Sequence, residues 1–136
     1  TGADEEALRP VETALQLEPE SAVVNMEAGF LMLRLNRPHD GQRLLLRSIE
    51  LDGKQARPHY LLGVSFSQTG LPTLGRSHLE KAVELDSSYV DARYELGKNL
   101  AAAGEHAAAV EQFSAALKLA PDRADIRASR STSQPE

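Results

Sequence analysis

Three glycines recur at a fixed interval along this chain of 136 residues. Thirty-four residues separate Gly29 from Gly63, and the same interval separates Gly63 from Gly97. Self-similarity at a period of about 20 to 50 residues is typical of repeat proteins, in which one small unit is stacked on copies of itself. We therefore expect a stack of similar units, and this expectation constrains the fold more than any other feature of the sequence.

Other positions repeat at the same interval and share a size or a backbone preference. They are the large residues Met32, Phe66 and Leu100; the turn formers Asn36, Gly70 and Gly104; the small residues Ala7, Gly41, Gly75 and Ala109; and the apolar residues Val11, Leu45, Leu79 and Phe113. This register defines three complete units, which span 22–55, 56–89 and 90–123.

Each unit is predicted to form two helices. Ala28, Gly29 and Met32 lie on one face of a 3.6-residue helix, and the later units repeat this spacing. The turn formers that follow are expected to take the left-handed conformation that ends a helix. A second apolar helix comes next, and the small residues are expected where the two backbones cross at close range. A bulkier residue there would overpack the crossing.

Composition narrows the class of partner. The chain carries 15 Lys and Arg against 20 Asp and Glu, a net charge of −5, which argues against nucleic acid or an anionic membrane as the main partner. It has no Cys, which excludes disulfides and thiolate metal sites and leaves the compartment open. No apolar run approaches the roughly 18 residues of a membrane span, and we find no signal-peptide pattern.

The sequence has no spacing typical of a catalytic or metal-binding site. The histidines lie at different positions of the repeat, without metal-ligand spacing: His39, His59, His78 and His106. We expect them to be solvated surface side chains, and we expect no metal and no cofactor. The serines have no nucleophile-elbow pattern, and the glycines follow the repeat instead of a phosphate-binding loop. The segment is therefore not expected to be an enzyme.

The unit at 90–123 matches a known pattern of small, large and turn-forming residues most fully, through Leu96, Gly97, Leu100, Gly104, Ala109, Phe113, Ala116 and Pro121. This pattern resembles the tetratricopeptide repeat, and the resemblance covers roughly residues 2–123. One departure is the fourth position of each unit, which is often Trp in the family. Here it is Asn25, His59 and Arg93, so we expect the contact made at that position to be lost.

The resemblance implies an all-α fold, a TPR-like α–α superhelix, which is a solenoid of antiparallel helix pairs with about three and a half repeats. The expected division is the second helix of a truncated first repeat at 1–21, complete repeats at 22–55, 56–89 and 90–123, and the start of a further helix with a frayed tail at 124–136. Because 1–21 matches only half a repeat, we expect the native protein to continue upstream. Pro10 predicts a kink in that helix, or a helix that starts near Arg9.

In this family, fixed positions of each first helix line the inner wall of the array. Carried over to this chain, they give a candidate partner-binding groove formed by Met26, Phe30, Arg34, Arg57, Tyr60, Val64, Gln68, Asp91, Tyr94 and Lys98. Tyr60 and Tyr94 occupy the same position in successive units and are expected side by side, either as contacts for a partner or as padding of the groove. Met26 and Phe30 have an alternative role, which is to pack on an upstream helix or on another copy of the chain.

Chaperone-binding members of the family hold a peptide carboxylate with Lys, Asn and Arg. The equivalent positions here are Met26, Phe30, Leu61, Asp91 and Glu95. Two acids stand where cations are needed, so no carboxylate clamp for a chaperone tail is expected. A segment with apolar anchors and a basic flank, facing Asp91 and Glu95, fits these positions better.

The resemblance thus implies a protein-interaction scaffold that binds a peptide or helical segment of a partner protein in a concave groove. Two alternatives stay open. The segment is a substrate-recruiting repeat arm of a larger enzyme, or it is a self-assembly module that forms homo-oligomers through exposed repeat ends. The sequence leaves the identity of the partner and the compartment undetermined.

Overall fold

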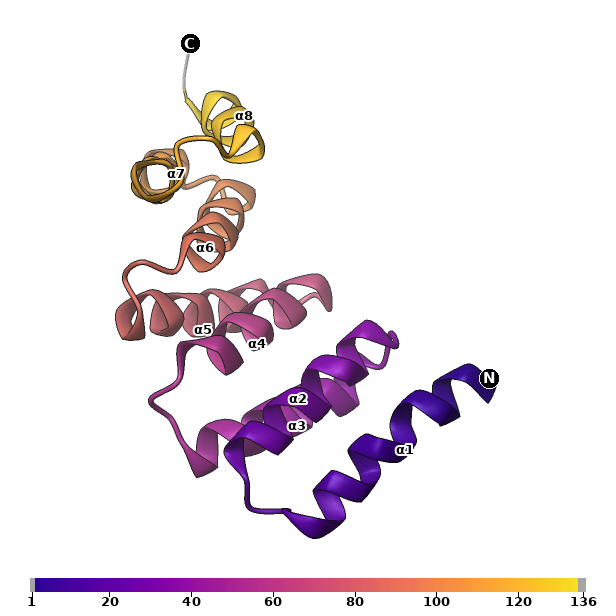
Figure 1. Ribbon diagram of the computed structural model, residues 1–136. Coiled ribbons are helices and arrows are strands. Elements are labelled where there is room, and N and C mark those ends of the chain that lie inside the picture. Colours follow the sequence, from indigo (N-terminus) through magenta and orange to yellow (C-terminus); the bar gives the residue numbers. More distant parts are fainter. Residues whose placement is uncertain (1, 135–136) are drawn as a thin grey trace.

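The computed structural model describes residues 2–134, and all regular structure in this range is α-helical. The helices are α1 (Gly2–Leu17), α2 (Ala22–Arg34), α3 (Pro38–Leu51), α4 (Ala56–Gln68), α5 (Pro72–Leu85), α6 (Val90–Ala102), α7 (His106–Leu119) and α8 (Ala124–Ser133). Figure 1 shows them following one another in a curved, elongated array with the two termini at opposite ends. The expected all-α solenoid is confirmed.

The helices pack in consecutive pairs, α2 with α3, α4 with α5, and α6 with α7, and each pair packs on the next. Across residues 2–134, successive first helices of the pairs (α2, α4, α6 and then α8) also contact one another. The second helices (α1, α3, α5 and α7) have no such contacts among themselves. The first helices therefore lie together on one side of the array, which we call the inner side, and the second helices lie on the other, which we call the outer side.

Glycine lets the two helices of a pair meet backbone to backbone. A Cβ atom placed on Gly63 of α4 would lie 2.5 Å from Leu79 Cγ and 3.0 Å from the carbonyl oxygen of Gly75, both in α5. The α2–α3 crossing is alike, since a Cβ on Gly41 would lie 2.9 Å from the carbonyl oxygen of Gly29. Nothing larger than a hydrogen atom fits at these positions, so the repeating glycine is explained by close approach.

The turns between the helices of each pair also follow the prediction. Asn36, Gly70 and Gly104 have φ angles of 60°, 85° and 83°, in the left-handed region. Pro38 and Pro72 begin the next helix in two of the pairs, where a missing N–H leaves no helical hydrogen bond unmade.

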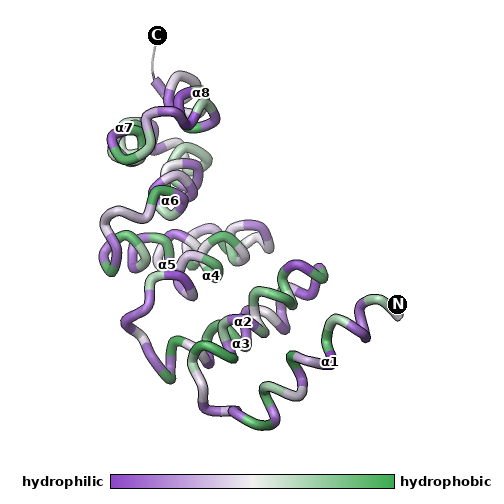
Figure 2. The backbone as a smooth tube through the Cα atoms, in the orientation of Figure 1, coloured by the Kyte–Doolittle hydropathy of each residue, from purple (hydrophilic) through white to green (hydrophobic). Residues whose placement is uncertain are grey.

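Hydrophobic and hydrophilic residues alternate along the helices (Figure 2). One core cluster joins α5 to α8 through Leu79, Leu96, Leu100, Ala109, Phe113, Ala116, Leu117 and Ile126. A second cluster joins α3 to α4 through Leu45, Leu61, Leu62 and Phe66. None of the helices between residues 2 and 134 is both long enough and apolar enough to cross a lipid bilayer.

Helix α1 runs without interruption through Pro10, so the alternative of a helix that starts near Arg9 is wrong. Pro10 is exposed, as is Glu6 one turn earlier, whose carbonyl loses its helical donor to the proline. Water can reach that carbonyl, so the helix tolerates the proline. The hydroxyl of Thr13 donates to the carbonyl oxygen of Arg9 at 3.0 Å on the same stretch.

The polar residues at the fourth position of each repeat make hydrogen bonds in place of the apolar contact of a Trp. Asn25 is buried and donates to the carbonyl oxygens of Pro19 and Ser21 at 3.1 and 2.8 Å. Arg93 donates to the carbonyl oxygen of Ser87 at 2.8 Å.

The histidines are also not all solvated. His39 and His106 are exposed, but His59 is only 7% exposed and His78 is half-buried. His59 occupies the fourth position of its repeat, which faces the second helix of the pair, and its ring lies against that of His78 in α5. Packing between the helices therefore overrides the usual preference of histidine for the surface.

Candidate functional site

A hollow of about 340 Å³ lies on the inner side of the array between first helices α2 and α4. Its lining combines apolar, aromatic and polar side chains: Phe30, Leu33, Arg34, Asn36, Pro38, Tyr60, Leu61, Val64, Ser65, Gln68 and Thr69. Half of the groove residues expected from the sequence lie here: Phe30, Arg34, Tyr60, Val64 and Gln68. We call this hollow the α2–α4 pocket.

Two arginines converge on one aromatic ring at the edge of this pocket. The guanidinium carbon of Arg57 lies 5.0 Å from the centroid of the Phe30 ring, and that of Arg34 lies 5.8 Å from it. Arg34 follows Phe30 by one turn of α2, and Arg57 comes from the first turn of α4. Both distances are within the range of cation–π contacts, so Phe30 holds the two charges at the groove surface.

Met26 does not line the pocket. It is half-buried, and it packs together with Phe30 against the cluster of Leu45, Leu61, Leu62 and Phe66. It precedes Phe30 by one turn of α2.

The remaining expected groove residues gather around Tyr94 in α6. Lys98 Nζ lies 4.5 Å from the centroid of the Tyr94 ring and 2.9 Å from the carboxylate of Glu95. The guanidinium carbon of Arg123 lies 5.7 Å from the centroid, and its Nη1 donates to Asp91 at 3.0 Å. Arg123 also contacts the carboxylate of Asp125 at 2.9 Å, so Asp91, Glu95 and Asp125 share two cations around Tyr94.

Tyr60 takes Tyr89 as its aromatic neighbour in place of Tyr94. The ring centroids of Tyr60 and Tyr89 are 5.0 Å apart, whereas the ring of Tyr94 packs 5.9 Å from that of Phe113. Tyr89 immediately precedes α6 and is not among the groove residues expected from the sequence. A signal for it exists, because Arg123 contacts Tyr94 at the same separation of 29 residues in the next repeat.

The phenol of Tyr60 lies in an environment that opposes its ionisation. Burial raises the pKa of Tyr60 to about 12, with further contributions from the carboxylates of Glu95 and Asp91, while the positive charge of Arg123 acts in the opposite direction. Tyr60 is therefore a neutral hydrogen-bonding group over the whole physiological pH range.

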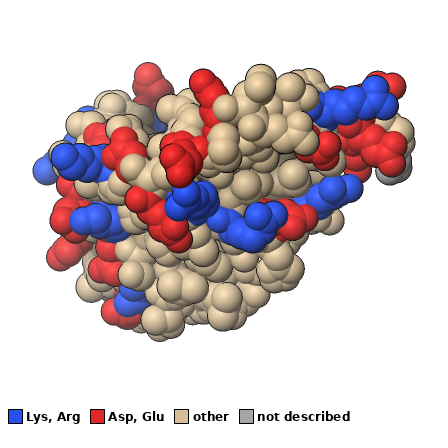
Figure 3. All heavy atoms as spheres, turned by 90° about the horizontal axis from the view of Figure 1, so that it is seen from below, with Lys and Arg blue, Asp and Glu red and all other residues tan. Residues whose placement is uncertain are grey.

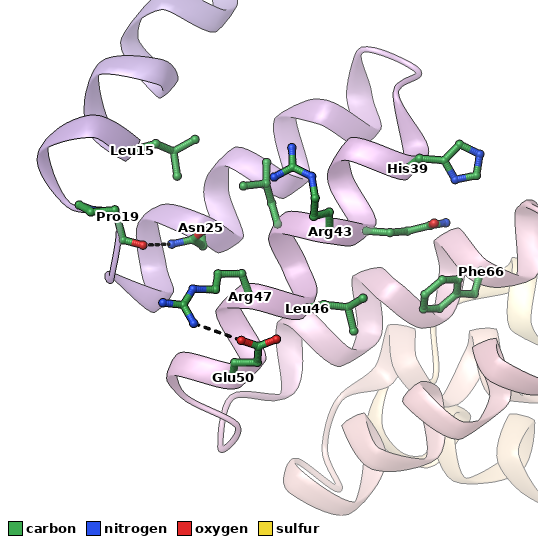
Figure 4. A pocket seen from close by; sticks show the side chains of 11 residues that line it. Leu15, Pro19, Asn25, His39, Arg43, Leu46, Arg47, Glu50 and Phe66 are labelled. Atoms are coloured by element: carbon green, nitrogen blue, oxygen red, sulfur yellow. Dashed lines mark hydrogen bonds and ion pairs between the residues drawn. The ribbon is translucent and has the colours of Figure 1, made fainter.

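A second, shallower hollow of about 760 Å³ lies on the outer side, between α1 and α3 (Figure 4). Its lining carries charges that are already paired, since Arg47 contacts Glu50 at 3.1 Å and Arg43 contacts Asp40 at 3.8 Å. Figure 3 shows one face of the molecule, on which cationic and anionic side chains are interspersed. No group of three or more His, Cys, Asp or Glu side chains within residues 2–134 is arranged to bind a metal ion.

Comparison with known proteins agrees with this geometry. A model of the tetratricopeptide repeat family matches residues 60–124. The resemblance to this family is therefore confirmed for these residues. A search among curated protein sequences finds no match to it.

Several solved structures share this fold. A crystal structure of MamA is 23% identical with a TM-score of 0.89, and the match covers 97% of this chain and 77% of MamA. YrrB, described as a TPR protein with an unusual peptide-binding site, is 24% identical with a TM-score of 0.82, with coverage of 97% and 68%. The second TPR domain of human RPAP3, solved with the HSP70 peptide SGPTIEEVD, is 18% identical with a TM-score of 0.79, with coverage of 85% and 96%.

Other residues occupy the positions at which chaperone-binding members of the tetratricopeptide repeat family hold a peptide carboxylate. Leu61 is buried, with 8% of its surface exposed. Asp91 is paired with Arg123, and Glu95 with Lys98. Both acids therefore contact a cation within the chain, and Asp91 shares Arg123 with Asp125.

Proposed function

We propose that this tetratricopeptide repeat array is a scaffold that binds a segment of a partner protein along its inner side, in the groove formed by α2, α4 and α6. The α2–α4 pocket carries this proposal, because it combines an apolar floor with aromatic rings and hydrogen-bonding groups at its rim. Related folds support it. YrrB is described as having a peptide-binding site, and the second TPR domain of RPAP3 was solved with a bound peptide.

The chemistry of the groove residues suits a peptide or a helical segment. Tyr60, Tyr89 and Tyr94 offer broad apolar faces with little side-chain freedom to lose on binding. Gln68 is exposed and can donate to and accept from a peptide backbone. The helices that carry these groups are held by their neighbours, so the groove is preorganised and ordering it costs little free energy.

Site-specific cross-linking in a lysate of the source organism tests the site of binding. A photoreactive phenylalanine analogue replaces Gln68 in the groove or, as the matched control, Arg43 on the outer side; both side chains are exposed. We expect a cross-linked partner from position 68 and none from position 43. The Tyr60→Ala/Tyr94→Ala variant should lose that partner while circular dichroism shows that its helices are intact. Cross-links from position 43 alone would place the binding surface on the outer side.

A second candidate function, self-association, has an observation of its own in α1. Helix α1 is more exposed than the other second helices at equivalent positions. Ala7 is exposed and Val11 is half-buried, whereas Gly41 and Leu45 of α3 are buried. Leu17 at the end of α1 is 77% exposed. Light scattering at increasing protein concentration separates this candidate from the first, because only self-association makes the mass rise with concentration.

A further inference from the structure

Two histidines join α4 to α5 inside the middle repeat, and neither lines the α2–α4 pocket. Nδ1 of His59 is 3.0 Å from Nδ1 of His78, and the two ring centroids are 5.2 Å apart. His59 is buried and His78 is half-buried, so solvent reaches the pair through His78. The ring of Phe66, two turns after His59 in α4, stacks on His78 at a centroid distance of 5.7 Å. His78 of α5 therefore contacts α4 at two points.

The contact between the two imidazoles tolerates one added proton and not two. In the neutral pair, one Nδ1–H donates to the other Nδ1, and a single added proton leaves this hydrogen bond in place with a charged donor. A second added proton puts a hydrogen on both Nδ1 atoms. Two donors of like charge then face each other at hydrogen-bond distance, so the contact has to open.

The surroundings of the pair oppose the second proton while the contact is closed. Burial, followed by the positive charges of His78 and Lys81, lowers the pKa of His59 to about 4, although a hydrogen bond with the Gly53 backbone favours the cation. Burial also lowers the pKa of His78. Lys81 contacts the exposed carboxylate of Glu84 at 3.3 Å. Within residues 2–134, neither α3 nor α6 adds a carboxylate to the charges that act on the two rings.

The pair lies beside the groove in the same helix. Tyr60 follows His59 directly in α4, lines the α2–α4 pocket and packs on both hydrophobic clusters. Its ring lies 5.0 Å from that of Tyr89. Gly63, where α4 meets the backbone of α5, comes one turn after His59. Opening of the pair would therefore tilt the first turns of α4 about this crossing, and Tyr60 would move with them.

We propose that the His59–His78 pair is an acid-sensitive switch of the groove. When both imidazoles carry a proton, the start of α4 separates from α5, Tyr60 leaves its place in the wall of the α2–α4 pocket, and a bound segment is released. This inference rests on the proposed function and adds a regulation of the same site. It differs from a general loss of stability, because the movement of Tyr60 precedes the unfolding of the helices.

The chain can report this movement without a ligand, because its three tyrosines are Tyr60, its neighbour Tyr89, and Tyr94 in the next repeat. Fluorine NMR of the intact chain labelled with 3-fluorotyrosine gives a resonance for each, which single Tyr→Phe variants assign. Circular dichroism follows the helices at the same pH values. Between about pH 6 and pH 4, we expect the Tyr60 resonance to shift before the helical signal falls. The resonance of Tyr94, which packs on Phe113, should shift less.

Variants of the pair assign the shift to the two histidines. His59→Asn introduces the residue that occupies the same position of the first repeat, Asn25. This variant should keep its Tyr60 resonance unshifted by acid down to the pH at which its helices unfold. His78→Gln, on the other side of the contact, covers the case in which His59→Asn does not fold. The matched control is His39→Gln/His106→Gln, which leaves the pair intact and should shift like the wild type.

Release of a partner is measured with the photoreactive analogue at position 68. The immobilised chain captures protein from the lysate at pH 7 and is washed at pH 4.5 before illumination. Compared with a wash at pH 7, the acid wash should reduce the cross-linked product at least about fivefold in the wild type and less than about twofold in His59→Asn. The variant thereby controls for acid effects on the partner itself.

The outcomes separate the two proposals. A Tyr60 resonance that shifts equally in the wild type and His59→Asn, or that moves only together with the helical signal, would overturn the switch and leave the groove function standing. Equal loss of cross-link from both proteins would do the same. No cross-link from position 68 at pH 7 would overturn the proposed function, and the release with it.

Discussion

The Nδ1 atoms of His59 and His78 lie 3.0 Å apart across the contact between α4 and α5. One ring must donate and the other accept, so the pair needs at least one neutral imidazole. Burial, followed by the positive charges of His78 and Lys81, lowers the pKa of His59 to about 4, against the opposing effect of a hydrogen bond with the Gly53 backbone. Burial also lowers the pKa of His78. The ring of Phe66 covers His78 on one side, at a centroid distance of 5.7 Å.

The pair predicts a loss of stability in acid. The pKa of His59 is about 6.5 when unfolded and about 4 when folded, so the unfolded chain binds more protons between these values. The free energy of unfolding should therefore be unaffected by the pair above about pH 7 and fall by about 1–3 kcal/mol from there to pH 4. Urea unfolding across this range measures it, and His59→Leu/His78→Leu should show a flatter profile than the wild type.

The exposed histidines supply the control for this experiment. His39→Gln/His106→Gln should keep the wild-type profile, because both side chains are in solvent. If the buried and exposed variants change the profile equally, the pair is not the source of the acid sensitivity.

Substitution of the crossing glycine should destabilise the α4–α5 pair. In Gly63→Ala the new methyl group would overlap Leu79 and crowd the carbonyl oxygen of Gly75, which should cost about 1–3 kcal/mol in the free energy of unfolding. Gly2→Ala is the control, because a Cβ there meets no atom within 4 Å. Combining Gly63→Ala with Leu79→Ala should cost less than the sum of the two single changes, and an additive result would argue against the contact.

The left-handed turn at Gly70 makes a different prediction, since a Cβ there has open space around it. Gly70→Ala should still cost about 1 kcal/mol, because the φ of 85° is unfavourable for a residue with a Cβ. Gly53→Ala, at a glycine without a positive φ, should be close to neutral in the same thermal or urea unfolding measurement. A neutral Gly70→Ala would mean that the turn relaxes to another conformation.

Hydrogen bonds between side chains of consecutive helix pairs should make the repeats unfold cooperatively. Gln42 donates to Ser65 at 2.9 Å, and Arg76 donates to Asn99 at 3.2 Å, 23 residues apart in both cases. Gln42→Ala/Arg76→Ala weakens the contacts between pairs and leaves each pair intact. We expect a loss of about 1–3 kcal/mol and a smaller denaturant dependence, because neighbouring repeats then unfold less cooperatively. The exposed Arg43→Ala should change neither quantity.

The helix pairs and their turns were predictable from the interval of 34 residues, because the residues that determine them recur at that interval. Gly29 and Gly63 lie at backbone contacts, and Asn36 ends a helix in the expected conformation. The polar residues at the fourth position were misjudged for a physical reason. A sequence shows that Asn25 or His59 departs from an apolar pattern, but the hydrogen-bond partners that make burial favourable come from other turns and helices.

The lining of the α2–α4 pocket was predictable in part, and the pairing of the charged side chains was not. Fixed positions of the first helices identified Phe30 and Tyr60 as lining residues of a shared hollow. Which charges stay free depends on side chains that reach in from the connections, as Arg123 does toward Asp91. Tyr89 was missed for the same reason, although its separation of 29 residues from Tyr60 recurs between Tyr94 and Arg123.

The backbone contacts at Gly29 and Gly63 separate the support of the array from its recognition surface. The spacing of the helices is set where Gly29 and Gly63 meet the facing helix, whereas Arg34, Arg57 and Gln68 project from the inner side into solvent. New ligand preferences are therefore within reach of single amino-acid changes. A lineage of such proteins can drift from one partner to another through intermediates that all fold.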